Sequence, residues 1–108
     1  MTSRILEARH EVDELNPCYA ATSHDVNFLA LALCGEVGEL ANKIKKRWRD
    51  GCVTAGTTND DIRDEIADIR IYLELIADQF SIAGEKLDIL ATSKLRRVAD
   101  EIRAGKRK

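Results

Sequence analysis

Two short acidic pairs carry the residue types best suited to chemistry in this chain: Glu36 with Glu39, and Glu65 with Asp68. In each pair the carboxylates are three residues apart, which places them one turn apart on the same face of a helix. Carboxylates that two packed helices bring together would repel one another in a low-dielectric core. Divalent cations between them reverse that repulsion, because hard cations such as Mg²⁺ take oxygen ligands. The spacing therefore predicts a metal site.

Helical periodicity places both pairs at the border of a core. At about 100° per residue, the first pair clusters with Lys43 within roughly 60°, beside an apolar stripe. The second pair clusters in the same way with Tyr72, beside an apolar stripe of its own. A surface helix usually places its acids opposite the apolar stripe, so these carboxylates differ from ordinary solvated ones. The opposite, solvent-facing side of the second segment is predicted at Arg63, Arg70, Glu74 and Asp78.

A single pair of this kind has an ordinary structural explanation, because acids three residues apart are common on solvated helices. Two core-adjacent pairs, among which only Lys43 offers a basic partner one turn away, favour the metal site. Asp61, one turn before Glu65, is either a further ligand or part of the helix start at residues 58–61.

Length and composition indicate one all-α domain spanning residues 1–108, too short for two independent cores. One proline, six glycines and few alternating β-branched residues argue against a sheet. The net charge of −2 provides no global field that would recruit nucleic acid. No apolar run approaches the roughly 20 residues that span a bilayer, and the N-terminus lacks a signal-peptide core. We therefore expect no membrane partner and a cytoplasmic location.

Four helices are predicted from the apolar periodicity. Ser23 or Thr22 is expected to cap the second helix. Residues 1–23 form an N-terminal helix and loop, residues 24–104 the core helices, and residues 105–108 a basic tail. The predicted helices lie at residues 3–15, 24–49, 60–80 and 85–104.

The second helix is apolar on nearly every side at residues 28–34. A helix of one small bundle exposes a face to water, so this segment predicts a homodimer or homotetramer with the helix at its centre. Cys34, inside the segment, is expected to be buried. With Cys18 and Cys52 it makes three widely spaced cysteines, which indicate neither a disulfide framework nor a zinc finger.

Residues 31–46, together with residues 64–73, resemble the MazG-like all-α nucleoside triphosphate pyrophosphohydrolases. The signature of that family is Glu-x-x-Glu, a spacer, and then Glu-x-x-Asp; here 25 residues separate Glu39 from Glu65. The resemblance is close over residues 24–80 and loose in the last helix. It implies a four-helix bundle-type fold, assembled as a dimer or tetramer through the central long helix.

The resemblance also implies a hydrolase dependent on Mg²⁺, with Mn²⁺ a possible substitute, that converts a (deoxy)nucleoside triphosphate to the monophosphate and pyrophosphate. Glu36, Glu39, Glu65 and Asp68 would bind the metal, and Glu36 or Glu39 would assist in deprotonating the attacking water. Candidate substrate contacts are Lys43, Trp48, Tyr72, Lys94 and Arg97.

Several readings of these residues stay open. Tyr72 and Trp48 either approach the substrate or only pack. Lys94 lies on the predicted inward stripe of the last helix, where it either contacts a substrate phosphate or extends its ammonium group to solvent. The last helix lacks the asparagine that relatives usually carry there.

Three other functions compete with this hydrolase. One is phosphoribosyl-ATP pyrophosphohydrolase, which shares the fold, and another is a non-catalytic helical interaction module. A nucleic-acid contact through the basic residues 43–49 is disfavoured, because that run covers several helix faces and the rest of the chain is acidic.

Overall fold

The computed structural model describes residues 3–51 and 57–106, and this part of the chain is helical, without strands. The all-α prediction is confirmed, and each of the four predicted helices begins and ends within two residues of an observed one. A further short helix, α2, was not predicted. Cys52 and residues 107–108 lie outside the described residues. The helices are α1 (Arg4–Leu15), α2 (Pro17–Ala20), α3 (Val26–Asp50), α4 (Asn59–Gln79) and α5 (Glu85–Arg103).

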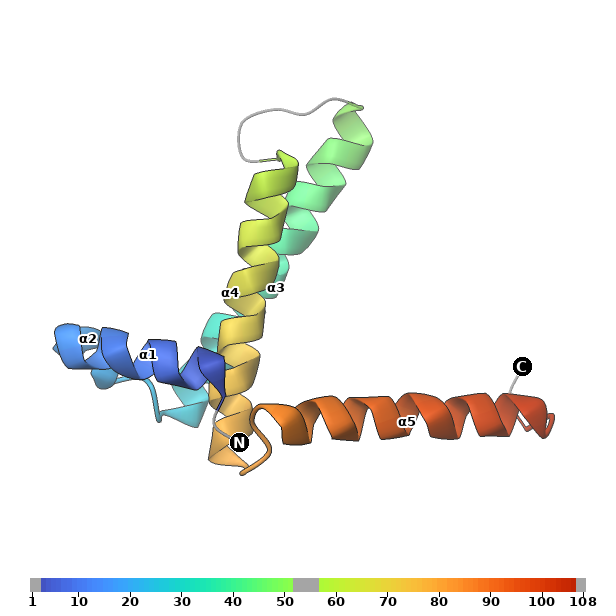
Figure 1. Ribbon diagram of the computed structural model, residues 1–108. Coiled ribbons are helices and arrows are strands. Elements are labelled where there is room, and N and C mark those ends of the chain that lie inside the picture. Colours follow the sequence, from blue (N-terminus) through green and yellow to red (C-terminus); the bar gives the residue numbers. More distant parts are fainter. Residues whose placement is uncertain (1–2, 52–56, 107–108) are drawn as a thin grey trace.

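Helices α3 and α4 lie side by side and form the main contact of the chain (Figure 1). Asp25 caps α3 by accepting hydrogen bonds from the N–H groups of Asn27 and Phe28. Thr58 and Asp61 form a reciprocal capping box at the start of α4. The expected cap at Ser23 or Thr22 is therefore wrong, and Asp61 has the helix-start role that was one of its two readings.

The N-terminal segment folds against this helical pair. Asn16 ends α1 and caps α2, whose first residue is Pro17. The buried hydroxyl of Ser23 donates to the carboxylate of Asp13 at 2.7 Å, which ties the loop after α2 back to α1. Helix α1 contacts α4, and α2 packs on α1 at a greater distance from the α3–α4 pair (Figure 1).

Helix α5 leaves the end of α4 at a corner and points away from the α3–α4 pair (Figure 1). A single chain therefore does not close the expected four-helix bundle. Among the described residues, the buried hydrophobic side chains are Leu29, Leu75 and Ala77. A core of this size offsets little of the conformational entropy lost on folding.

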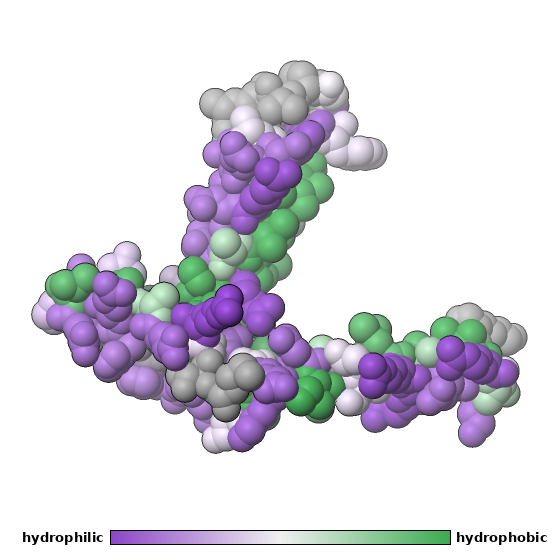
Figure 2. Space-filling model, viewed as in Figure 1, coloured by the Kyte–Doolittle hydropathy of each residue, from purple (hydrophilic) through white to green (hydrophobic). Residues whose placement is uncertain are grey.

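Much apolar surface remains uncovered in one chain. Leu31 on α3 is 75% exposed and Leu95 on α5 is 71% exposed. Apolar surface runs along the α3 side of the helical pair and along the upper side of α5 (Figure 2). Cys34 is also exposed, so its predicted burial is wrong within a single chain. No helix in the described part of the chain is both long enough and apolar enough to cross a membrane.

Glu74, predicted on the solvent face of α4, is instead completely buried at the α4–α5 corner. Its carboxylate accepts a hydrogen bond from the N–H of Gly84, and Arg70 lies 3.7 Å away. Arg70 also reaches Asp88 of α5 at 3.6 Å. The apolar stripe of α4 did not predict this burial, because Glu74 is covered at the corner by the segment around Gly84.

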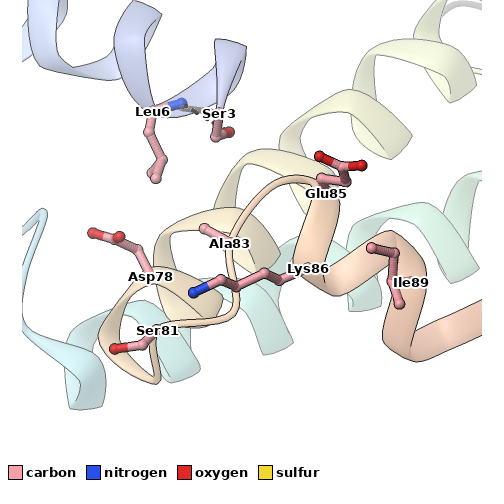
Figure 3. A pocket seen from close by; sticks show the side chains of 8 residues that line it. All are labelled: Ser3, Leu6, Asp78, Ser81, Ala83, Glu85, Lys86 and Ile89. Carbon is pink, nitrogen blue, oxygen red and sulfur yellow. Dashed lines mark hydrogen bonds between the residues drawn. The ribbon is translucent and has the colours of Figure 1, made fainter. Parts of the chain in front are cut away.

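A cavity of about 480 Å³ opens in the same corner (Figure 3). Ser3 and Leu6 approach it from α1, while Lys86 and Ile89 approach it from α5. A Cβ atom on Gly84 would lie 3.5 Å from the Cβ of Ser3, and the φ of Gly84 is +70°. Glycine is therefore required here mainly by its backbone conformation.

Replacing Glu74 with Leu should lower the free energy of unfolding by about 1–3 kcal/mol, because the partly buried N–H of Gly84 loses its acceptor. Glu74→Gln keeps a carbonyl oxygen and should cost less. The measurement is urea-induced unfolding followed by circular dichroism. The exposed neighbour Asp78 provides the control, since Asp78→Asn should change stability by less than about 0.5 kcal/mol. Equal stability of Glu74→Leu and the wild type would contradict this account.

Candidate metal centre

Three of the four predicted metal ligands come together where α3 packs on α4. Glu36, Glu65 and Asp68 each direct a carboxylate oxygen to one place, and these three oxygens lie within 4.8 Å of one another. Oxygen ligands of Mg²⁺ lie about 2.0–2.1 Å from the ion, so small side-chain rotations would let three such oxygens share one cation. The three-residue spacing on α4 sets Glu65 and Asp68 one turn apart on the face that meets Glu36.

Glu39 lies at the edge of this group, outside the three oxygens that converge. Its side chain is exposed, one turn beyond Glu36 on α3. Its negative charge still raises the pKa of Glu36, so it lies close enough to act on the cluster. The predicted tetrad is thus three converging carboxylates and one exposed neighbour.

Glu65 is the buried member of the cluster, with 7% of its surface exposed. One carboxylate oxygen accepts a hydrogen bond from the ammonium group of Lys43 at 2.7 Å. The other oxygen, Oε2, is buried and has no hydrogen-bond donor among the described residues. A buried acceptor without a partner costs about 1–3 kcal/mol, and either a proton on Glu36 or a cation would satisfy it. The residues present therefore fit a hard divalent cation.

The pKa values of the cluster follow from the close approach of its charges. The hydrogen bond to Glu65, burial, and the neighbouring negative charges raise the pKa of Glu36 to about 7. Burial, together with the charges of Asp64 and Glu65, raises the pKa of Asp68. The hydrogen bond from Lys43 lowers the pKa of Glu65 and raises that of Lys43 itself. The metal-free cluster thus holds a proton near neutral pH at a position that a cation could take.

A cavity of about 510 Å³ adjoins the carboxylates. Glu36 and Asp68 form part of its wall, and Tyr72 lies beside them, as its clustering with the second acidic pair indicated. From the N-terminal segment, Arg9 and Tyr19 line it together with apolar residues of α1. The sequence analysis did not identify these two residues. The spacing of Arg9 and Asp13, four residues apart on α1, could have indicated that Arg9 is held in a fixed position by an ion pair.

The other predicted substrate contacts lie elsewhere in the single chain. Trp48, near the end of α3, is 83% exposed and does not line the cavity. Lys94 and Arg97 are exposed on α5, which points away from the carboxylates (Figure 1). Leu95 and Ile102 on the same helix are 71% and 56% exposed, so the face of α5 predicted to point inward is largely uncovered in one chain. Lys43 does reach the cluster, through its bond to Glu65.

The chain is similar to a phage protein whose name states no activity. The chain is 36% identical over 59 residues to the Gene 37 protein of Mycobacterium phage L5. The matched segment covers 53% of this chain and 51% of that protein, so the match spans about half the length of each. No family model matches the chain, and no solved structure matches it.

The raised pKa of Glu36 predicts how the stability of the metal-free protein depends on pH. The folded state favours the protonated carboxyl of Glu36. The stability that this proton provides is therefore fully present below pH 4.5, the ordinary pKa of a glutamate, and is lost as the pH rises through about 7. The melting temperature should therefore fall between about pH 5 and about pH 8 in chelator. Glu65 has the opposite sign, since its lowered pKa stabilises the fold above 4.5 and that contribution is lost only in more acidic solution.

Glu36→Gln should flatten the profile over that interval, and Mg²⁺ should flatten it in the wild type, because each removes the titrating proton. Glu11→Gln, an exposed change on α1, serves as the control and should keep the wild-type profile. A wild-type melting temperature that is constant in chelator from about pH 5 to about pH 8 would disprove the assignment.

Proposed function

We propose that the protein is a Mg²⁺-dependent nucleoside triphosphate pyrophosphohydrolase, which releases pyrophosphate and leaves the nucleoside monophosphate. The observation that carries the proposal is the convergence of Glu36, Glu65 and Asp68, together with the unpartnered buried oxygen of Glu65. The resemblance of both acidic segments to the MazG-like enzymes supports the same chemistry. The adjoining cavity is in the size range of small-molecule sites, which supports a small substrate.

Glu36, Glu39, Glu65 and Asp68 would hold the metal, which would neutralise the triphosphate and activate a water molecule. The water oxygen forms a bond to the α-phosphorus as the bond to the bridging oxygen breaks and pyrophosphate leaves. Glu36 or Glu39 would receive the proton of the water. Lys43 holds Glu65 in place through their hydrogen bond.

We also propose that the active form is a homodimer or homotetramer in which partner helices cover the exposed faces of α3 and α5. The exposed Leu31 and Leu95 and the small core of one chain support this assembly. Packing α5 on a second copy would close a four-helix bundle-type arrangement between chains. Lys94 and Arg97 could then approach the phosphate region of a neighbouring site.

Purified protein should release pyrophosphate, and not orthophosphate, from at least one nucleoside triphosphate, and only with Mg²⁺ or Mn²⁺. The assay is a panel of common nucleoside and deoxynucleoside triphosphates plus phosphoribosyl-ATP, which tests the alternative pyrophosphohydrolase. Orthophosphate as the first product, or full activity in excess chelator, would contradict the proposal.

Glu65→Gln should reduce kcat at least about a hundredfold while the protein stays folded, because it removes the central buried ligand. The matched control is Asp60→Asn on the same helix, where the carboxylate is exposed and outside the cluster. Wild-type turnover in Glu65→Gln would contradict the assigned site, because it would show that these acids hold no catalytic metal.

Light scattering at micromolar concentration should show a dimer or tetramer. Leu31→Glu should shift the protein toward the monomer, since it places a charge on the exposed apolar face of α3. Arg63→Glu, an exposed change on the polar side of α4, should leave the mass unchanged. A stable wild-type monomer at this concentration would refute the proposed assembly.

A further inference from the structure

The N-terminal helices wall the cavity with groups that the proposed hydrolysis does not use. Arg9 and Tyr19 line the cavity of about 510 Å³ together with Glu36, Asp68 and Tyr72. A second cavity of about 220 Å³ shares Arg9, Tyr19 and Tyr72 as lining residues. These three side chains therefore stand between the cavity beside the carboxylates and the second, more aromatic cavity.

Arg9 is held rigidly in this wall, with 11% of its side chain exposed. Its Nε donates to Asp13 at 2.9 Å, and a terminal nitrogen donates to the backbone oxygen of Tyr19 at 3.3 Å. The guanidinium carbon lies 5.0 Å from the centre of the Tyr19 ring. Burial opposes the charge of Asp13, yet the hydrogen bonds from Ser23 and Arg9 lower its pKa overall, so it stays ionised as a partner. The contacts with Asp13 and Tyr19 therefore fix the orientation of the guanidinium in the absence of a ligand.

The guanidinium retains donors for a ligand. It carries five N–H groups, and the bonds to Asp13 and Tyr19 use two of them. No other acceptor within the described residues bonds Arg9. The walls next to these donors are the rings of Tyr19, Tyr72 and Phe28. A planar group of donors beside aromatic rings matches a planar base that stacks and presents a carbonyl oxygen.

We infer that Arg9 donates a hydrogen bond to a carbonyl oxygen of the nucleobase, and that Tyr19 and Tyr72 contact the face or edge of that base. The site therefore favours nucleotides with keto-bearing bases over adenine, whose acceptors are ring nitrogens and which has no carbonyl oxygen projecting toward Arg9. The inference rests on the proposed function only in that the carboxylates hold the phosphate end of the same ligand.

Isothermal titration with non-hydrolysable α,β-imido triphosphates and Mg²⁺ tests the selectivity without relying on turnover. The panel carries uracil, cytosine, guanine, hypoxanthine and adenine. At least one keto-bearing analogue should bind at least about tenfold more tightly than the adenine analogue, and Arg9→Met should remove that difference. Equal affinity for the adenine analogue, or no binding by any member of the panel, would overturn the inference.

Inorganic tripolyphosphate with Mg²⁺ separates the base from the phosphates. Arg9→Met should leave its affinity unchanged; an equal loss for tripolyphosphate and for nucleotides would assign Arg9 to the phosphates and overturn the inference. Arg63→Met, which removes an exposed arginine of α4, is the control and should bind every ligand like the wild type. Pyrophosphate release is measured separately, so base selectivity can fail while hydrolysis stands, and the reverse.

Tyr19→Leu is the second variant, because it keeps the backbone oxygen and the Arg9–Asp13 bond while removing the ring. It should weaken binding of the preferred nucleotide at least about fivefold without affecting tripolyphosphate. If Arg9→Met melts below the assay temperature, unchanged nucleotide binding by Tyr19→Leu overturns the inference.

Discussion

The close approach of carboxylates at the α3–α4 contact is the constraint on which the candidate site depends. Glu36, Glu65 and Asp68 converge in a partly buried place where their mutual repulsion is only partly relieved by Lys43. The chain lowers that repulsion by retaining a proton on Glu36, and a divalent cation would lower it further. Helix packing thus holds the apo cluster in a state that binding of a cation would relax.

The local patterns of α3 and α4 predicted much of this site. Acids one turn apart beside an apolar stripe identified Glu36, Glu65 and Asp68 correctly as neighbours, because both helices are regular and pack directly on each other. Glu39 was harder to place, since its angular position lies near the edge of the contact. Helix boundaries were also predictable from caps and turn residues, although Asp25 rather than Ser23 caps α3.

Features that depend on the arrangement of whole elements were not predictable from such patterns. Burial of Glu74 requires the corner after α4 to fold back over it. Arg9 joins the cavity because the Ser23–Asp13 bonds place α1 beside the carboxylates. The apolar stripe of α5 was read as inward, yet the direction of α5 is set at the corner and not by its own sequence. Periodicity identifies a face of a helix but not the surface that it meets.

Because α5 is attached to the rest of the chain at the Gly84 corner, a small change of angle there displaces its far end by a large distance. The helix has 19 residues, so it is about 28 Å long, and a rotation of about 10° at its base would move its far end by about 5 Å, close to one helical turn. Interdigitating side chains do not tolerate a displacement of that size. The Gly84–Glu74 hydrogen bond and the Arg70–Asp88 contact join α4 to the start of α5, so they restrict the angle between the two helices. This angle determines where Leu95 can contact another surface.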